Sequence, residues 1–80
     1  MPLRFRAQAD RHGVPRRSTW HVAMTTKSVP VITNWGEAGN LFVGIDDRGI
    51  ELEVITVTRH GQEVVVHSMP TAHRHDTSRS

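Results

Sequence analysis

The most informative stretch of the sequence is residues 41–58, LFVGIDDRGIELEVITVT. Two runs rich in β-branched and apolar residues flank DDRG at 46–49, where glycine can take the positive φ that tight turns often require. Apolar and charged residues alternate along residues 50–54, which is the period of a half-buried strand. A further run, QEVVVHSM at 62–69, follows the turn formers of residues 59–61. The sequence therefore predicts a three-stranded antiparallel meander of Leu41–Asp46, Ile50–Thr58 and Gln62–Met69.

Two helices and an edge strand are predicted before this meander. Leu3–His12 is expected to form the first helix, which ends at Gly13 because glycine takes the left-handed conformation at no steric cost. Pro15 suits the first turn of a second helix that extends to about Thr26, with Trp20 packed on the sheet. Residues 29–33, VPVIT, are predicted to form an edge strand because proline cannot donate to a β-ladder.

Together these elements predict an α+β fold of the form α-α-β-β-β-β. Its two N-terminal helices pack on one face of a four-stranded antiparallel sheet. We expect residues 1–70 to form a single domain and residues 71–80 to form a polar, flexible tail. A chain of 80 residues is too short for a second domain.

The composition excludes several classes of protein. The chain has no cysteine, which rules out disulfides and thiolate metal sites. No apolar run approaches the ~18 residues of a membrane span, and residues 1–13, MPLRFRAQADRHG, lack the apolar core of a signal peptide. The glycines at 36 and 39 are not followed by the lysine and helix of a phosphate-binding loop. We therefore expect a cytoplasmic protein with no membrane association and no cofactor.

Charge is distributed unevenly along the chain. Residues 1–27 contain six basic residues against Asp10, a net charge of +5, and residues 37–63 contain six acidic residues against two arginines, a net charge of −4. A basic N-terminal part of this kind can attract a polyanion such as nucleic acid. A solvated helical face that binds nothing has the same pattern, so charge alone leaves both interpretations open.

Three segments of the chain resemble BrnT-like toxins, members of the RelE superfamily in type II toxin–antitoxin systems. RHGV at 11–14 is similar to the element between the first two helices of these toxins. GIDDRGIELEV at 44–54 is similar to their G-x-x-x-x-G-x-x-L-x-V hairpin, and HSMPTAHR at 67–74 to the H-A-M-P-x-R ending of actinobacterial members. In BrnT itself an arginine-rich segment follows the last strand, whereas here Arg74 is the one arginine close to that point.

This resemblance implies a RelE-like fold, an RNA-cleaving activity and inhibition by a protein antitoxin. Cleavage of RNA without a metal requires a base for the 2′-hydroxyl, an acid for the leaving 5′-oxygen and cations for the charge at phosphorus. Histidine suits the first two roles because its ordinary pKa is near neutrality. His12, His67 and Arg74 are the predicted catalytic residues, and His73 is a further histidine candidate.

Arginine suits the third role because its planar guanidinium binds two phosphate oxygens at once. The predicted RNA-binding residues are Arg11, Arg16, Arg17 and Arg59. Trp35, in a loop before Gly36, is the more exposed of the two tryptophans in this interpretation and can stack on a base.

Each of these residues has a simpler interpretation. His12 precedes a glycine at a helix end, where a histidine often complements the last carbonyl groups. His67 can be a packing residue on a strand. Glu51 and Glu53 share one strand face and could act as a base, but two carboxylates would repel phosphate, so we favour the interpretation of a solvated strand face. His73 and His75 offer two ligands, whereas a specific metal site usually needs three or four, so we expect no metal site.

Three hypotheses about function and partners remain open at this point. The leading hypothesis is a toxin-like ribonuclease with RNA and an antitoxin as partners. The alternative is a small binding module without activity, which binds nucleic acid through the basic N-terminal helices or a protein through the edge strand that contains Pro30. A homo-oligomer is the third, because a core of this size is thin.

Overall fold

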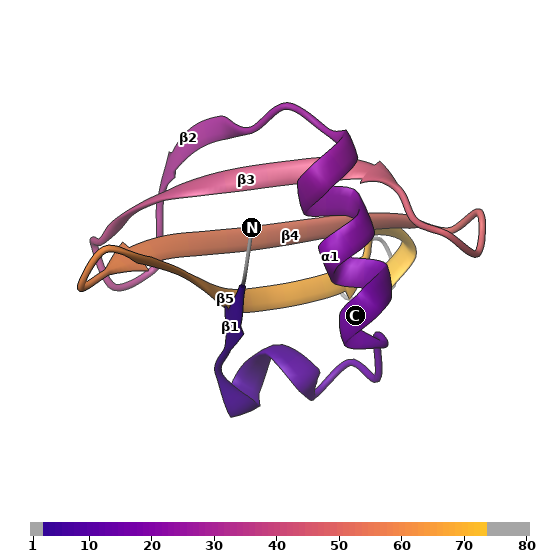
Figure 1. Ribbon diagram of the computed structural model, residues 1–80, viewed down its shortest axis with the longest axis horizontal. Helices are drawn as coiled ribbons and strands as arrows, with labels where there is room; N and C mark the ends of the chain where they lie inside the picture. The colour runs from indigo at the N-terminus through magenta and orange to yellow at the C-terminus, as the bar shows by residue number, and fades with distance from the viewer. Residues whose placement is uncertain (1–2, 74–80) are drawn as a thin grey trace.

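The computed structural model describes residues 3–73 of the chain. Its elements are β1 (Arg4–Phe5), the short 3-10 helix η1 (Ala7–Asp10), α1 (Arg16–Thr25), β2 (Val29–Ile32), β3 (Ala38–Ile45), β4 (Glu51–Arg59) and β5 (Gln62–Pro70). Residues 71–73 are helical. The five strands form one sheet with the order β1-β5-β4-β3-β2, and α1 lies across one face of it (Figure 1).

The predicted meander is confirmed. Strands β3, β4 and β5 pair in sequence order, each antiparallel to the next. The hairpin between β4 and β5 has a two-residue loop, His60 and Gly61, whose φ angles are 54° and 76°. Two positive φ angles are the mark of a type I′ turn, which matches the twist of the strands that it joins. The strand that contains Pro30, β2, lies at the edge of the sheet, as proline requires.

The predicted first helix, Leu3–His12, is wrong. Arg4 and Phe5 pair in parallel with Val64 and Val65 of β5, and η1 then covers four residues. Apolar and charged residues alternate from Leu3 to Arg6, and this period fits an edge strand better than a helix. A helix of ten residues would be marginal by itself, whereas β5 offers a free edge. Residues 3–73 therefore do not form two helices on a four-stranded sheet; they contain one α-helix of ten residues, α1, and a five-stranded sheet with a parallel edge.

Helix α1 forms close to the predicted range but packs through a different face. Its buried residues are Ser18, Thr19, Val22 and Ala23, whereas Trp20 is 45% exposed. The expectation that Trp20 packs on the sheet is therefore wrong. Small residues bring the helix close to the strands, and the Oγ atoms of Thr19 and Ser68 form a buried hydrogen bond of 2.6 Å between α1 and β5.

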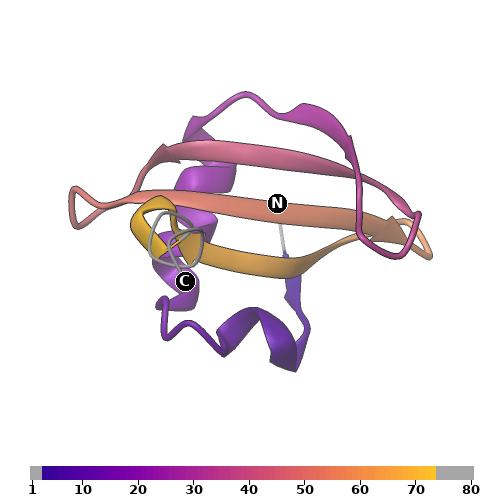
Figure 2. The same cartoon turned by 180° about the vertical axis from the view of Figure 1, so that it is seen from behind.

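The core lies between α1 and the sheet and is built from small aliphatic residues. It consists of Ala9, Val14, Val22, Leu52, Val54 and Val65, with Leu3, Phe5 and Phe42 packed against it. The other face of the sheet is turned toward the viewer in Figure 2, where α1 lies behind the strands. Among residues 3–73, no helix is long and apolar enough to cross a membrane.

A β-bulge interrupts the pairing of β4 with β5. Ile55 pairs with His67 and Thr56 pairs with Val65, so Val66 is the extra residue on β5. The bulge reverses the alternation of β5: Val65 enters the core next to α1, while Val66 and His67 line a pocket. Without the bulge, simple alternation would put Val65 and His67 on the same face of the sheet.

Candidate functional site

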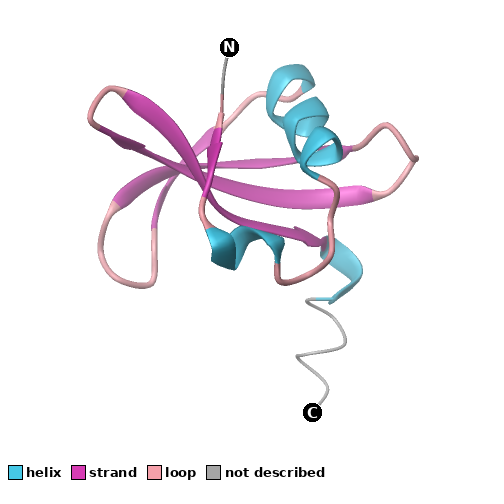
Figure 3. Cartoon of the chain, turned by 60° about the horizontal axis from the view of Figure 1, so that its bottom comes forward, coloured by secondary structure: helices cyan, strands magenta, loops and turns pink. Residues whose placement is uncertain are grey.

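His12, His67 and His73 lie together although they come from three separate parts of the chain. His12 is in the loop after η1, His67 is on β5 and His73 is in the helical residues after β5. The ring centroids of His12 and His67 are 5.8 Å apart, and those of His12 and His73 are 5.9 Å apart. Figure 3 shows the loop after η1 beside the end of β5. The parallel pairing of β1 with β5 brings this loop there, so the corrected N-terminal structure creates the cluster.

Glu53 completes the cluster from the neighbouring strand. Its Oε2 lies 3.1 Å from Nε2 of His67, and the two side chains are 12% and 28% exposed. The pairings of Glu53 with Met69 and of Ile55 with His67 make Glu53 and His67 diagonal neighbours on one face. A carboxylate that accepts the N–H of a histidine fixes the orientation and the tautomer of the ring. The solvated-face interpretation is therefore wrong for Glu53, whereas Glu51 is exposed and accepts a hydrogen bond from Thr71.

The electrostatic surroundings of His12 favour its neutral form. Partial burial lowers the pKa of His12 first, and the positive charges of His67, Arg11 and His73 lower it further, while Glu53 opposes them. A histidine with a lowered pKa is deprotonated at neutral pH and can accept a proton. His12 therefore has the protonation state that a general base requires.

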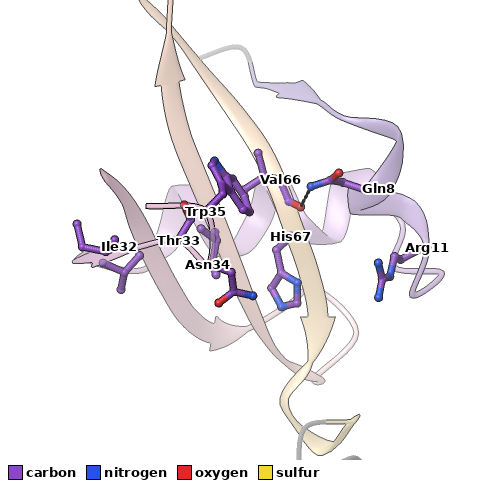
Figure 4. Close-up of a pocket in the computed structure, with 10 residues that line it drawn as sticks. Gln8, Arg11, Ile32, Thr33, Asn34, Trp35, Val66 and His67 are labelled. Atoms are coloured by element: carbon purple, nitrogen blue, oxygen red, sulfur yellow. Dashed lines mark hydrogen bonds between the residues drawn. The ribbon is translucent and has the colours of Figure 1, made fainter. Parts of the chain in front are cut away.

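A pocket of about 420 Å³ opens next to His67, on the sheet face away from α1. Gln8 and Arg11 lie on one side, residues 32–35 on the other, and Val66 and His67 between them (Figure 4). Nε2 of Gln8 donates a 3.4 Å hydrogen bond to the carbonyl oxygen of Val66, the bulge residue. The bulge thus points His67 into the pocket and also holds η1 against β5, as bulges near functional sites often do.

The far wall of the pocket is held by a chain of side chains. Nε1 of Trp35 donates to Oε1 of Glu37 at 2.7 Å. The guanidinium of Arg59 donates to both oxygens of Glu37, at 2.7 and 3.3 Å. These hydrogen bonds, from Arg59 first and from Trp35 second, lower the pKa of Glu37 from 4.5 to about 2. The backbone N–H of Glu37 also donates to Oγ1 of Thr33 at 2.9 Å, so the loop is tied at both ends.

The structure separates the predicted RNA-binding arginines into two groups. Arg11 lines the pocket and forms no ion pair within residues 3–73. Arg16 is paired with Asp10 at 2.7 Å, Arg59 is paired with Glu37 and Arg17 lies 3.9 Å from Asp47, all outside the lining of the pocket. Arg74 lies outside the described residues. Arg11 is thus the one of the five that this geometry places at the site.

The residues predicted from the sequence that meet at the site are His12, His67, His73 and Arg11, whereas Glu53 and Gln8 were not predicted. Glu53 could have been found from the register of the meander, since it faces the same side as Ile55, the partner of His67. Gln8 carries no signal, because its position depends on the pairing of β1 with a strand about 60 residues away.

The arrangement can carry out proton transfer next to a bound anion. Two histidine rings less than 6 Å apart can act as proton acceptor and proton donor. Glu53 orients one of these rings, and Arg11 supplies a positive charge. Within residues 3–73 no three histidine or acidic side chains are grouped in a way that could hold a metal ion. Comparison of the chain with protein-family models, with curated proteins and with solved structures gives no match.

Proposed function

We propose that the protein is a toxin-like ribonuclease that cleaves single-stranded RNA at this pocket, with one histidine accepting a proton from the RNA and another donating a proton to it. The observation that carries the proposal is the distance of 5.8 Å between the rings of His12 and His67, which are 55 positions apart in the sequence. Two such rings beside an arginine can supply the base, the acid and the cation that RNA cleavage without a metal needs.

In the proposed reaction His12 is the base and His67 is the acid. His12 takes the proton of a ribose 2′-hydroxyl, and the 2′-oxygen forms a bond to phosphorus. The bond from phosphorus to the 5′-oxygen breaks on the opposite side, and the protonated His67 ring gives its proton to that oxygen. Arg11 binds the non-bridging oxygens and stabilises the negative charge. The products are a 2′,3′-cyclic phosphate and a free 5′-hydroxyl, and no water or cofactor is consumed.

The resemblance to BrnT-like toxins gives a second line of support. The segments RHGV, GIDDRGIELEV and HSMPTAHR contribute His12, Glu53 and His67 in turn, and these three residues belong to one cluster. The fold that the resemblance implied is wrong, so this support rests on the convergence of the three segments and not on the architecture.

The test is a cleavage assay on a single-stranded RNA in the presence of a chelator. We expect the wild-type protein to cleave, and His12→Asn and His67→Asn each to lose activity by at least about 100-fold, the usual size of a general acid or base contribution. His60→Asn is the matched control, because His60 is exposed, lies outside the pocket lining and has a positive φ that asparagine tolerates. His60→Asn should cleave at the wild-type rate.

Two results would contradict the proposal. One is intact RNA at high protein concentration together with no growth arrest on expression. The other is equal loss of activity in His60→Asn and His67→Asn, since that would assign the effect to folding and not to the site.

A second candidate function is capture of a protein partner at β2. This edge strand is the part of the described chain where large apolar side chains are most exposed: Val29 is 57% and Ile32 is 70% exposed. An exposed apolar edge can add a strand from a partner or from a second copy. Sedimentation of the wild-type protein and of Ile32→Lys distinguishes self-association from a monomer: the lysine should abolish a dimer formed through β2 and leave a monomer unchanged.

A further inference from the structure

We infer that Trp35 is the platform on which the pocket stacks an unpaired base of single-stranded RNA. This inference rests on the proposed function, because it assigns a specificity element to the same pocket. The indole is 52% exposed and lines the pocket together with His67 and Arg11. An exposed indole at the wall of a pocket presents a flat aromatic surface on which a base can stack.

A hydrogen bond from its N–H group holds the indole of Trp35 in place. Its N–H is donated to Glu37 at 2.7 Å, and Glu37 is in turn bound by two nitrogens of Arg59. This chain satisfies the one polar atom of the indole and leaves the rest of the exposed ring available for contact. The negative charge of Glu37 is neutralised by Arg59, so it does not repel a phosphate close to the ring.

The position of the ring matches the proposed reaction. In Figure 4 His67 lies between Arg11 on one side and Asn34 and Trp35 on the other. A strand that places its phosphate between Arg11 and the histidines can place a base against the opposite wall, where Trp35 lies. Stacking on an aromatic ring is available to every base, so this contact selects unpaired RNA and not a particular sequence. Double-stranded RNA has its bases stacked on each other and cannot use the platform.

The experiment uses the fluorescence of the two tryptophans, Trp20 and Trp35, which are the only ones in the sequence. Trp20→Phe leaves Trp35 as the reporter, and Trp35→Phe leaves Trp20, an exposed residue on α1, as the matched control. The probe is a 2′-O-methyl oligoadenylate of eight nucleotides, which cannot be cleaved because the nucleophilic hydroxyl is blocked. Heparin serves as a polyanion without bases.

We expect the oligoadenylate to quench the fluorescence of Trp20→Phe and to leave that of Trp35→Phe unchanged, and we expect heparin to quench neither. Trp35→Ala should bind the oligonucleotide about tenfold more weakly than the wild type, while Trp35→Phe recovers most of the affinity. Glu37 acts here as a positioning residue. Glu37→Ala should reduce the fluorescence anisotropy of Trp35 in the Trp20→Phe background, and Glu37→Gln, which keeps an oxygen acceptor, should restore it.

The inference fails separately from the proposed function. If the wild type binds or cleaves RNA but Trp35 is not quenched and Trp35→Ala binds normally, the stacking role of Trp35 is overturned. The proposed ribonuclease activity is not overturned by that result. If the wild-type protein neither binds the oligoadenylate nor cleaves RNA, both are overturned.

Discussion

His12 is the residue whose chemistry depends most on the fold around it. Its pKa is lowered below 6.5 by burial and by the charges of His67, Arg11 and His73. In the unfolded chain this group binds a proton at a higher pH than in the folded chain, so the folded state loses stability as the pH falls below 6.5. Above that pH the group is neutral in both states and contributes no difference.

The variant His12→Asn tests this pH dependence of the stability. The free energy of unfolding of the wild type, measured by urea titration, should fall relative to that of His12→Asn as the pH is lowered from 7 to 5. The mutant cannot gain a proton at this position, which is why the two curves should separate. Parallel curves over this range would mean that His12 is not desolvated next to the other cations.

The turn between β3 and β4 shows how one side chain stabilises an element. One oxygen of Asp46 accepts hydrogen bonds from the backbone N–H groups of Arg48 and Ile50, and the other accepts from the Arg48 guanidinium. Burial raises the pKa of Asp46, but the hydrogen bonds from Ile50 and Arg48 lower it further than burial raises it, and the pKa ends below 3.8. The carboxylate is thus charged at neutral pH and bound by several donors.

We predict that Asp46→Ala lowers the free energy of unfolding by about 2 kcal/mol, because the backbone donors of the turn lose their acceptor. Arg48→Ala is the control. It removes the ion pair but keeps both backbone hydrogen bonds, and its cost should stay below about 1 kcal/mol. Denaturant titration of both variants at pH 7 checks the order. Equal costs would show that the ion pair, and not the turn, stabilises this element.

The residue that follows α1 lies close against β3. A Cβ added to Gly44 would overlap the Oγ1 atom of Thr26, which follows the last residue of α1. Gly44→Ala should therefore cost about 1–3 kcal/mol through overpacking. Thr26→Ala removes the overlapping atom, so the double variant should recover part of the loss in a double-mutant cycle. Strict additivity would mean that the two residues are not in contact.

For the whole molecule, the part of the fold that can be predicted is the part built from contacts between residues close together in the sequence. The meander follows from alternation, from the glycines at the turns and from short connections, all of which are visible within 30 residues of sequence. β1 was not predictable in this way, because a strand of two residues exists only through its partner β5, about 60 positions later. The buried face of α1 was also mispredicted, since Trp20 is the largest residue of the helix but small residues fit the narrow space over the sheet.

In the candidate site, too, the features that depend on contacts between distant parts of the chain could not be predicted. The chemistry of His12, His67 and Arg11 was visible in the residue types, but their meeting was not, because it depends on the β1 pairing and on the bulge at Val66. Arg16 and Arg59 were assigned to RNA, whereas Asp10 and Glu37 bind them. Ion pairs between distant positions cannot be inferred from charge counts along a chain.

In the proposed reaction His12 and His67 act as one catalytic unit. Residues that act as a unit are strongly non-additive, because losing the first removes the benefit of the second. The most direct measurement compares the RNA cleavage rates of His12→Asn, His67→Asn and the double variant, in the presence of a chelator, with the ends of the products identified. We expect the wild type to leave 2′,3′-cyclic phosphate ends, and the double variant to cleave at no less than about one third of the rate of the slower single variant. Losses that multiply, or products without the cyclic phosphate, would contradict it.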